Sequence, residues 1–238
     1  MPQESPPINY KNFYRFPKSL IKDGRWASLP SASKTIFPVI AIYANAKGTA
    51  WPSQATIAKF AGCTPKTVRE GIAGLKSLPG FNVKSTINSR GQRRYIYQVP
   101  VPPLGRGQDF RFYRVFIDGH NWGQLSPGAK AVYPVIRTFA YFDYLEDYLG
   151  VLADKGLLCN LEYGNFSDEE VKEMYEKRVF DWADPDLDVL EELSGLCSKT
   201  VNQALGQLSK MDLIEWDDNL KLWRCFLRPK WIYAAEQE

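Results

Sequence analysis

Apolar side chains recur at helical spacing in two separate places along the chain. The first run is Ile36, Val39, Ile40 and Tyr43, and the second is Val132, Val135, Ile136 and Phe139. This spacing puts the four members of each run on one face of a helix, so each run predicts an amphipathic helix. A proline lies inside each run, at Pro38 and Pro134, and is expected to kink or unwind the helix there.

The stretch WPSQATIAKFAGCTPKTVREGIAGL, residues 51–75, predicts two short helices joined by a glycine. Ser53 is a favourable N-cap, and Gly62 can adopt the left-handed conformation that ends a helix. Thr64 then caps a second helix that begins at Pro65. The polar side of this second helix is basic. Two helices in this arrangement indicate a helix-turn-helix, with the second helix in the recognition position.

Residues 80–99 alternate apolar and polar side chains around the turn-forming sequence NSRGQ, which predicts a β-hairpin. A hairpin that follows a recognition helix is the wing of a winged-helix domain. Arg90, Arg93 and Arg94 cluster at its tip. Fold stability gives little reason to cluster three arginines within five residues, so we expect them to contact DNA.

The chain also contains an internal repeat. Residues 14–44 match 110–140 at an offset of 96, with 10 of 31 positions identical. Residues 57–76 match 190–209 at an offset of 133, with 5 of 20 identical. The difference between the offsets indicates an insertion in the second copy, at about 142–178. The sequence therefore predicts two tandem winged-helix domains from an internal duplication, mainly α with small β-hairpin wings (α+β).

The predicted domain boundaries follow from the repeat and from one change in composition. Three prolines followed by two glycines in VPVPPLGRGQ, near residue 104, indicate a short linker. We expect a flexible N-terminal arm (1–12), a basic, DNA-reading winged-helix domain (13–99), the linker (100–109), and a second winged-helix domain (110–233) that carries the insertion.

The charge differs strongly between the two parts of the chain. Residues 1–105 hold 15 Lys and Arg against 3 acidic residues, a net charge of +12, whereas 106–238 hold 15 against 24, a net charge of −9. Residues 142–187 alone carry −9. DNA should therefore attract the first part and, on average, repel the second. The acidic insertion is either a solvated face or a docking surface for a basic or helical protein partner.

The second copy keeps the apolar frame of the first and loses its cations. Arg69 corresponds to Asn202, and Lys84 to Asp217. Two interpretations of the second copy stay open. Asn202 and Gln203 could read adenines in a second half-site, because their amides suit that base. Alternatively, the second domain could serve self-association and structural support.

Candidate catalytic and metal-binding chemistry is sparse. The four cysteines contain no C-x-x-C pair, and His120 is the only histidine. The sequence also lacks a G-x-S-x-G nucleophile elbow and a phosphate-binding P-loop. We expect no enzymatic activity, no cofactor and no metal site. Without a long apolar run or a secretory signal, we expect no membrane association and a cytoplasmic location.

The quoted stretch WPSQATIAKFAGCTPKTVREGIAGL, together with FYRFPKSLIKDGRWASLPSASKTIFPVI before it, resembles the winged-helix replication initiators of bacterial plasmids and phages. The second copy, with LSPGAKAVYPVI and LSGLCSKTVNQALGQL, is similar in the same way. The resemblance implies origin binding as a dimer or higher oligomer and recruitment of host replication proteins, with the acidic C-terminal half as a candidate surface. A transcriptional or partition regulator is the main alternative. An interaction scaffold that never touches DNA is the third.

The candidate DNA-binding residues lie on the helix-turn-helix and the wing of the first domain. Lys66, Thr67 and Arg69 are expected to face the major groove, and the wing arginines the minor groove or the backbone. The full first set is Ser53, Gln54, Lys59, Thr64, Lys66, Thr67, Arg69, Lys84, Arg90, Arg93 and Arg94. The set for a second site is Lys199, Thr200, Asn202 and Gln203.

Overall fold

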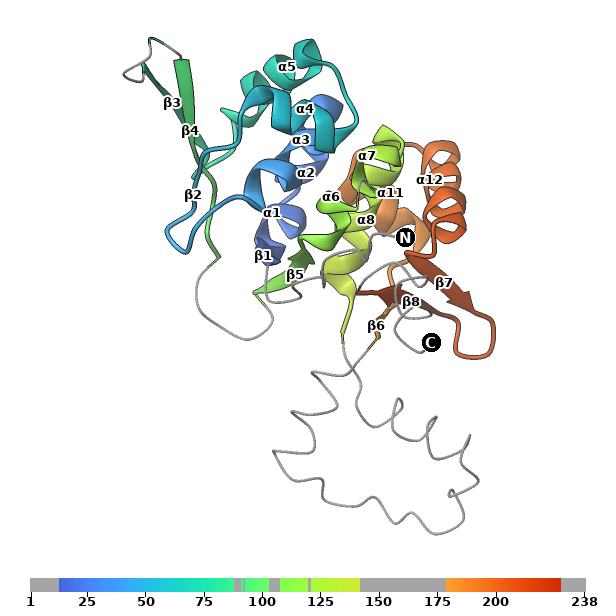
Figure 1. Cartoon of the computed structure of the whole chain (residues 1–238). Helices are drawn as coiled ribbons and strands as arrows, with labels where there is room; N and C mark the ends of the chain where they lie inside the picture. Colours follow the sequence, from blue (N-terminus) through green and yellow to red (C-terminus); the bar gives the residue numbers. More distant parts are fainter. Residues whose placement is uncertain are drawn as a thin grey trace, which may run out of the picture.

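The computed structural model describes residues 13–87, 91, 93–102, 108–119, 121–141 and 179–227. It is a mixed α/β structure with a central group of helices, a two-stranded sheet of β1 and β5, and one three-stranded antiparallel sheet toward each side (Figure 1). Among the described helices, none is both long and apolar enough to cross a bilayer. Several predicted features lie outside the described residues, namely the N-terminal arm (1–12), Arg90, linker residues 103–107, His120, the insertion (142–178) and residues 228–233.

The first half, residues 13–102, contains a compact set of helices and a three-stranded sheet. Strands β2, β4 and β3 form this sheet in the order β2-β4-β3, so that the hairpin β3–β4 extends from it. The elements are β1 (Phe13–Pro17), α1 (Lys18–Lys22), α2 (Arg25–Ser28), α3 (Ser31–Ala41), β2 (Thr49–Ala50), α4 (Gln54–Ala61), α5 (Pro65–Leu75), β3 (Asn82–Ile87) and β4 (Arg93–Gln98).

The second half, residues 108–227, has the same order of elements. Its sheet has the order β6-β8-β7, which matches that of the first half. The elements are β5 (Asp109–Tyr113), α6 (Val115–Asp118), α7 (Asn121–Gln124), α8 (Pro127–Phe139), β6 (Phe180–Ala183), α11 (Leu187–Ser194), α12 (Ser198–Lys210), β7 (Ile214–Asp217) and β8 (Leu222–Phe226). We call two residues equivalent when they are 96 apart before the insertion, or 133 apart from β2 to β3.

Helices α3 and α8 lie at the centre and continue past their prolines. Pro38 lies inside α3 and Pro134 inside α8, and both helices continue through their prolines, so the expected unwinding does not occur. Both helices are buried along almost their whole length. Tertiary packing of this kind supplies most of the stability of a helix and outweighs the one missing backbone hydrogen bond.

The halves meet through equivalent elements packed against each other. Strands β1 and β5 pair antiparallel, and the equivalent residues Arg15 and Arg111 lie opposite each other in the register. Helix α3 contacts its equivalent α8. Pairing of a residue with its own equivalent occurs only near a twofold axis, so the two halves are related by an approximate twofold that passes close to these arginines.

Buried tryptophans make reciprocal hydrogen bonds across this interface. The indole Nε1 of Trp26 donates to the carbonyl oxygen of Ala131 at 2.9 Å. The indole of Trp122, the equivalent residue, donates to the carbonyl oxygen of Thr35 at 2.8 Å. Thr35 and Ala131 are themselves equivalent. Each half therefore satisfies one buried indole of the other.

Two buried lysines join the halves in the same reciprocal way. Lys34 Nζ donates to the carbonyl of Ser194, at the end of α11, at 2.8 Å. Lys130 Nζ donates to the carbonyl of Ala61, at the end of α4, at 2.8 Å. The last carbonyls of a helix lack partners within it, and these ammonium groups satisfy them. Burial lowers the pKa of both lysines to about 8.

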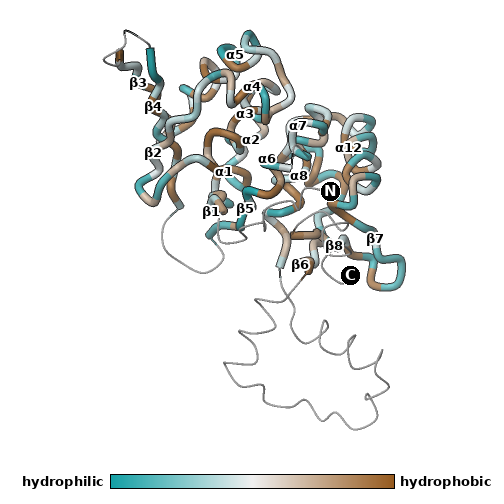
Figure 2. Tube along the Cα trace, in the orientation of Figure 1, coloured by the Kyte–Doolittle hydropathy of each residue, from teal (hydrophilic) through white to brown (hydrophobic). Residues whose placement is uncertain are grey.

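One hydrophobic cluster runs through both halves. The rings of Phe16 and Phe110 stack at its centre, with centroids 4.8 Å apart, and Trp26 and Trp122 are fully buried. Hydropathy along the chain agrees, since brown segments gather where the halves meet and α12 is mainly hydrophilic (Figure 2). Dividing the chain between residues 102 and 108 would expose this surface to water, so neither half buries its full core alone.

The insertion takes the place of a three-residue loop. In the first half, the backbone N–H of Asn45 donates to the carbonyl of Thr49 at 2.9 Å, closing the loop 46–48. The equivalent residues Tyr141 and Trp182 form an antiparallel bridge with hydrogen bonds of 2.7 and 2.8 Å. The chain therefore leaves the second half at Tyr141 and is back beside it at Trp182, and we call this bridge the closed point.

Candidate nucleic-acid interface

Local capping shapes the helix-turn-helix formed by α4 and α5. The hydroxyl of Ser53 accepts a hydrogen bond from the backbone N–H of Thr56 at 3.0 Å. The hydroxyl of Thr64 accepts one from the backbone N–H of Thr67 at 3.2 Å. Between the helices, Gly62 adopts a left-handed conformation, with φ of 64°. Each cap satisfies a backbone donor at a helix start and fixes where that helix begins.

Helix α5 is held against α3 by an unusually close backbone approach. Its apolar side, including Val68 and Leu75, is buried. A Cβ on Gly71 would lie 2.7 Å from the carbonyl oxygen of Ala32, and a Cβ on Gly74 would lie 2.3 Å from Ser33 Oγ. These glycines fix the position of the recognition helix. Sequence reasoning missed this approach, although two glycines three residues apart on a buried helix face are a usable signal.

The outer face of α5 presents the predicted major-groove residues. Lys66 and Arg69 are exposed. Lys66 lies 3.9 Å from Glu70, and because both side chains are largely exposed this pair contributes little and can give way to a phosphate. Thr67 is only half-exposed, and its hydroxyl lies 3.0 Å from that of Thr64. The structure thus places Thr67 and Thr64 in the cap of α5.

The hairpin β3–β4 projects from the body at the same end of the molecule as α5 (Figure 1). Lys84, Arg93 and Arg94 are exposed along it. Within the described part of the chain, none of these three has an ion-pair partner. Cations without carboxylate partners are available to phosphate oxygens, so the hairpin offers a basic surface beside the recognition helix.

The start of α4 and strand β4 enclose a pocket of about 560 Å³. Ser53 and Gln54 line it from the helix side, and Arg93 and Arg94 from the strand side. Four of the predicted residues are therefore brought together in one place. The pocket is completed by Trp51, Pro52 and Tyr95. Sequence reasoning missed Trp51, which is 55% exposed. Lys59 lies outside this lining and is exposed near the end of α4.

The second-site residues lie at equivalent positions on α12. Lys199, Asn202 and Gln203 are exposed, and Thr200 is half-buried. The side-chain amide of Asn202 folds back along the helix and donates to the carbonyl of Ser198 at 3.1 Å. The amide that would read a base under one of the two open interpretations is therefore bonded to its own helix.

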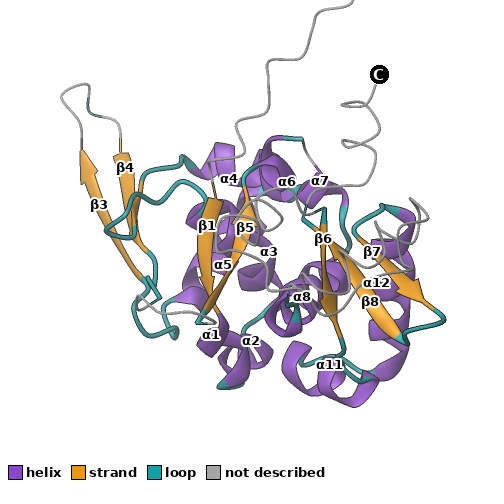
Figure 3. Cartoon of the chain, turned by 90° about the horizontal axis from the view of Figure 1, so that it is seen from below, coloured by secondary structure: helices purple, strands orange, loops and turns teal. Residues whose placement is uncertain are grey.

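The second hairpin lacks the arginine-bearing tip of the first. In the first hairpin Lys84 pairs with Ile96, and in the second Asp217 pairs with Leu222. Residues 85–95 lie between the first pair, whereas only 218–221 lie between the second. The shorter hairpin projects on the opposite side of the molecule from β3–β4 (Figures 1 and 3). The tip that carries the wing arginines thus has no counterpart in the second half.

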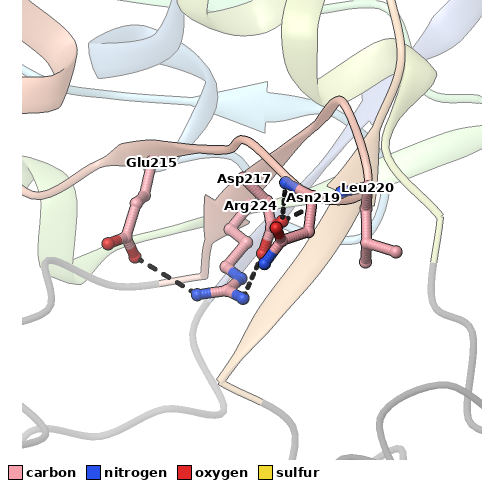
Figure 4. Close-up of polar contacts among 5 residues, drawn as sticks. All are labelled: Glu215, Asp217, Asn219, Leu220 and Arg224. Carbon is pink, nitrogen blue, oxygen red and sulfur yellow. Dashed lines mark hydrogen bonds and ion pairs between the residues drawn. The ribbon is translucent and has the colours of Figure 1, made fainter.

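The remaining arginine of the second hairpin is neutralised by acidic neighbours. Arg224 bonds to Asp217 and lies 3.7 Å from Glu215 (Figure 4). The backbone N–H groups of Leu220 and Asn219 donate to Asp217, and with Arg224 they lower the pKa of its carboxyl, which stays ionised. A phosphate approaching Arg224 would meet these two carboxylates first, so this hairpin is expected to repel the DNA backbone.

The comparisons with known proteins agree with this geometry. Residues 27–78 match a family model described as a helix-turn-helix domain. The matched segment runs from α2 through α3, α4 and α5 and ends just before the wing. No curated protein and no solved structure matches the chain. The chain therefore contains a winged-helix-like DNA-binding domain in its first half, and this domain supports sequence-specific binding of DNA.

Proposed function

We propose that this protein initiates replication of a plasmid or related mobile element by binding repeated duplex sites at an origin, without catalysis of its own. The observation that carries the proposal is the combined surface of α5 and the β3–β4 hairpin. Exposed cations of both elements lie at one end of a half whose net charge is +12. In this proposal, α5 enters the major groove and the hairpin contacts the flanking backbone.

We also propose that the two halves are tandem winged-helix domains produced by an internal duplication. The reciprocal indole bonds, the reciprocal lysine bonds and the shared sheet order support this proposal. An ancestor with one copy would have used the same contacts between two subunits. In the present chain these surfaces are buried within one molecule. A dimer or higher oligomer would therefore have to form through other surfaces.

The second half has a supporting role in this proposal. It completes the core of the first half and carries the acidic segment that could bind host replication proteins. The neutralised Arg224 and the shorter hairpin support this assignment over a second DNA-reading site. The acidic residues of 142–178 that would contact a host protein lie outside the described residues.

A transcriptional or partition regulator remains the alternative, because it would use the same DNA-reading surface. DNase footprinting of the full chain on the DNA that flanks its gene separates the two. Several protected direct repeats of one orientation would support initiation. A single protected palindrome over a promoter would support regulation instead. No protection at low salt would contradict DNA binding and favour a scaffold.

A further inference from the structure

We infer that the pocket between β4 and the start of α4 binds an unpaired nucleotide of single-stranded DNA. Trp51 would stack on the base, while Arg93 and Arg94 contact the adjoining phosphates. This inference goes beyond the proposed function, because reading a duplex through α5 does not require Trp51.

The first observation is the exposure of Trp51. Its side chain is 55% exposed, although the next residue, Pro52, is buried and fixes the backbone beside it. Among the described residues, the indole makes no ring contact and no hydrogen bond. Large aromatic side chains are usually buried because their burial is strongly favourable. An exposed indole that lines a pocket instead offers a flat stacking surface.

The second observation is that the fold does not need this tryptophan. Pro52 is equivalent to Pro185, which is also buried and also precedes a helix. Trp51 is equivalent to Asp184, so the same turn forms without an aromatic ring. Arg93 and Tyr95 lie in the part of the hairpin that has no counterpart in the second half. The pocket's aromatic and cationic groups are thus specific to the basic half.

The chemistry of the lining determines the ligand. A volume of about 560 Å³ falls within the range of roughly 300–1,000 Å³ that small ligands occupy. Proteins that bind single strands combine cations along the backbone with aromatic rings that stack on bases. Bases in a duplex are covered on both faces by their neighbours, so they cannot stack on Trp51. The lining therefore fits an unpaired nucleotide.

The test uses the full chain and a fluorescein-labelled oligothymidine of about 12 nucleotides, a length typical of one single-strand binding site. Fluorescence anisotropy is measured for wild type, Trp51→Ala, Trp51→Phe and Trp216→Ala. We expect Trp51→Ala to weaken binding roughly 5- to 150-fold, the fold-change that corresponds to loss of one stacked base. Trp51→Phe should retain most of the affinity. Trp216, 41% exposed on the acidic hairpin, is the matched control and should have no effect.

Duplex binding is measured on the same preparations, so that the two proposals can fail separately. We expect Trp51→Ala to bind the footprinted duplex as wild type does, while Arg69→Ala loses duplex affinity and keeps oligothymidine affinity. If Trp51→Ala lowered the affinity for both DNAs equally, the inference would be overturned, because Trp51 would then be a duplex contact. Absence of oligothymidine binding at low salt would also overturn it.

A competition arm distinguishes the two sources of an unpaired nucleotide. Thymidine monophosphate is added to the complex of protein and oligothymidine. We expect displacement only at concentrations far above that of the oligothymidine, since a single strand contributes several phosphate contacts. Displacement at equal nucleotide concentration would assign the pocket to a free nucleotide and overturn the single-strand assignment.

Discussion

The two halves of this protein make equivalent buried contacts, but their exposed surfaces differ in charge. Trp26 and Trp122 donate equivalent hydrogen bonds, as do Lys34 and Lys130. By contrast, the exposed Arg69 of α5 has the neutral Asn202 as its equivalent on α12. The comparison shows that the interior determines how the halves fold and pack, whereas exposed residues can change charge without altering the frame.

The largest effect should come from adding a methyl group where the backbones of the two halves are in close contact. A Cβ on Gly62 would lie 2.0 Å from the carbonyl oxygen of Gly123, and one on Gly195 would lie 2.5 Å from that of Ala27. Both glycines also have positive φ. We expect Gly62→Ala and Gly195→Ala each to lower the free energy of unfolding by about 3 kcal/mol, measured by urea denaturation.

Gly24 provides the control for this prediction. Its φ is 71°, but a Cβ there would meet nothing within 4 Å. Gly24→Ala should therefore cost only the left-handed strain, about 1 kcal/mol. Equal costs at Gly24 and Gly62 would show that the halves do not approach closely in solution.

The two recognition helices should differ in their effect on DNA affinity. We expect Arg69→Ala to cost roughly 1–3 kcal/mol of binding to the footprinted duplex and to relax the base preference at one position. Asn202→Ala, the equivalent change on α12, should leave binding unaltered. Gel-shift titration against a set of single-base variants measures both. A comparable loss for Asn202→Ala would instead identify α12 as the reader of a second half-site.

The two hairpins should differ in the salt dependence of binding. Replacing Arg90, Arg93 and Arg94 with Ala should reduce the slope of log K against log salt by roughly 0.9 for each phosphate that the variant no longer neutralises. Arg224→Ala should leave the slope unaltered, because Glu215 and Asp217 already neutralise this side chain. An unchanged slope in the triple variant would remove the wing from the interface.

The last prediction concerns pH and the two interface lysines. Folding lowers the pKa of Lys34 and Lys130 from 10.5 to about 8. Above pH 8 the unfolded chain therefore binds more protons, and these groups make the free energy of unfolding rise with pH. Burial raises the pKa of Cys225 to about 12 and acts oppositely above pH 9. The comparison is therefore restricted to pH 8–9.

Denaturation of wild type and of the double variant Lys34→Met, Lys130→Met at pH 8 and pH 9 measures this contribution. Subtracting the two pH dependences isolates the lysines from other titrating groups. We expect the free energy of unfolding to rise more between pH 8 and pH 9 for wild type than for the double variant. Equal pH dependences for the two proteins would mean that hydrogen bonds to the helix-end carbonyls keep both ammonium groups charged throughout this range.

Local features of the fold could be predicted from the sequence because they depend on near neighbours. Ser53, Thr64 and Gly62 cap or end helices through contacts within a few residues, and the family match at 27–78 confirms a helix-turn-helix there. The duplication, the domain boundaries and the individual DNA contacts stay predictions. The repeat offsets nevertheless correspond to elements of the structure, since β1 and β5 lie 96 residues apart.

Features that depend on distant partners could not be predicted. The close approach at Gly71 requires knowledge that α3 packs there, and the role of Lys34 requires the end of α11. The exposure of Trp51 was missed for the same reason: a tryptophan between a short strand and a helix is usually part of the core. The shared identity of Lys34 and Lys130 was a signal, but only the structure shows what they bind.

The closed point between Tyr141 and Trp182 makes this protein a suitable carrier for grafted domains. Two backbone hydrogen bonds hold Tyr141 and Trp182 together, so the two attachment points of a grafted domain would lie side by side. The equivalent loop between Asn45 and Thr49 has only three residues. We expect a fluorescent protein placed between 142 and 178 to leave the exposed basic surface of α5 and the β3–β4 hairpin accessible.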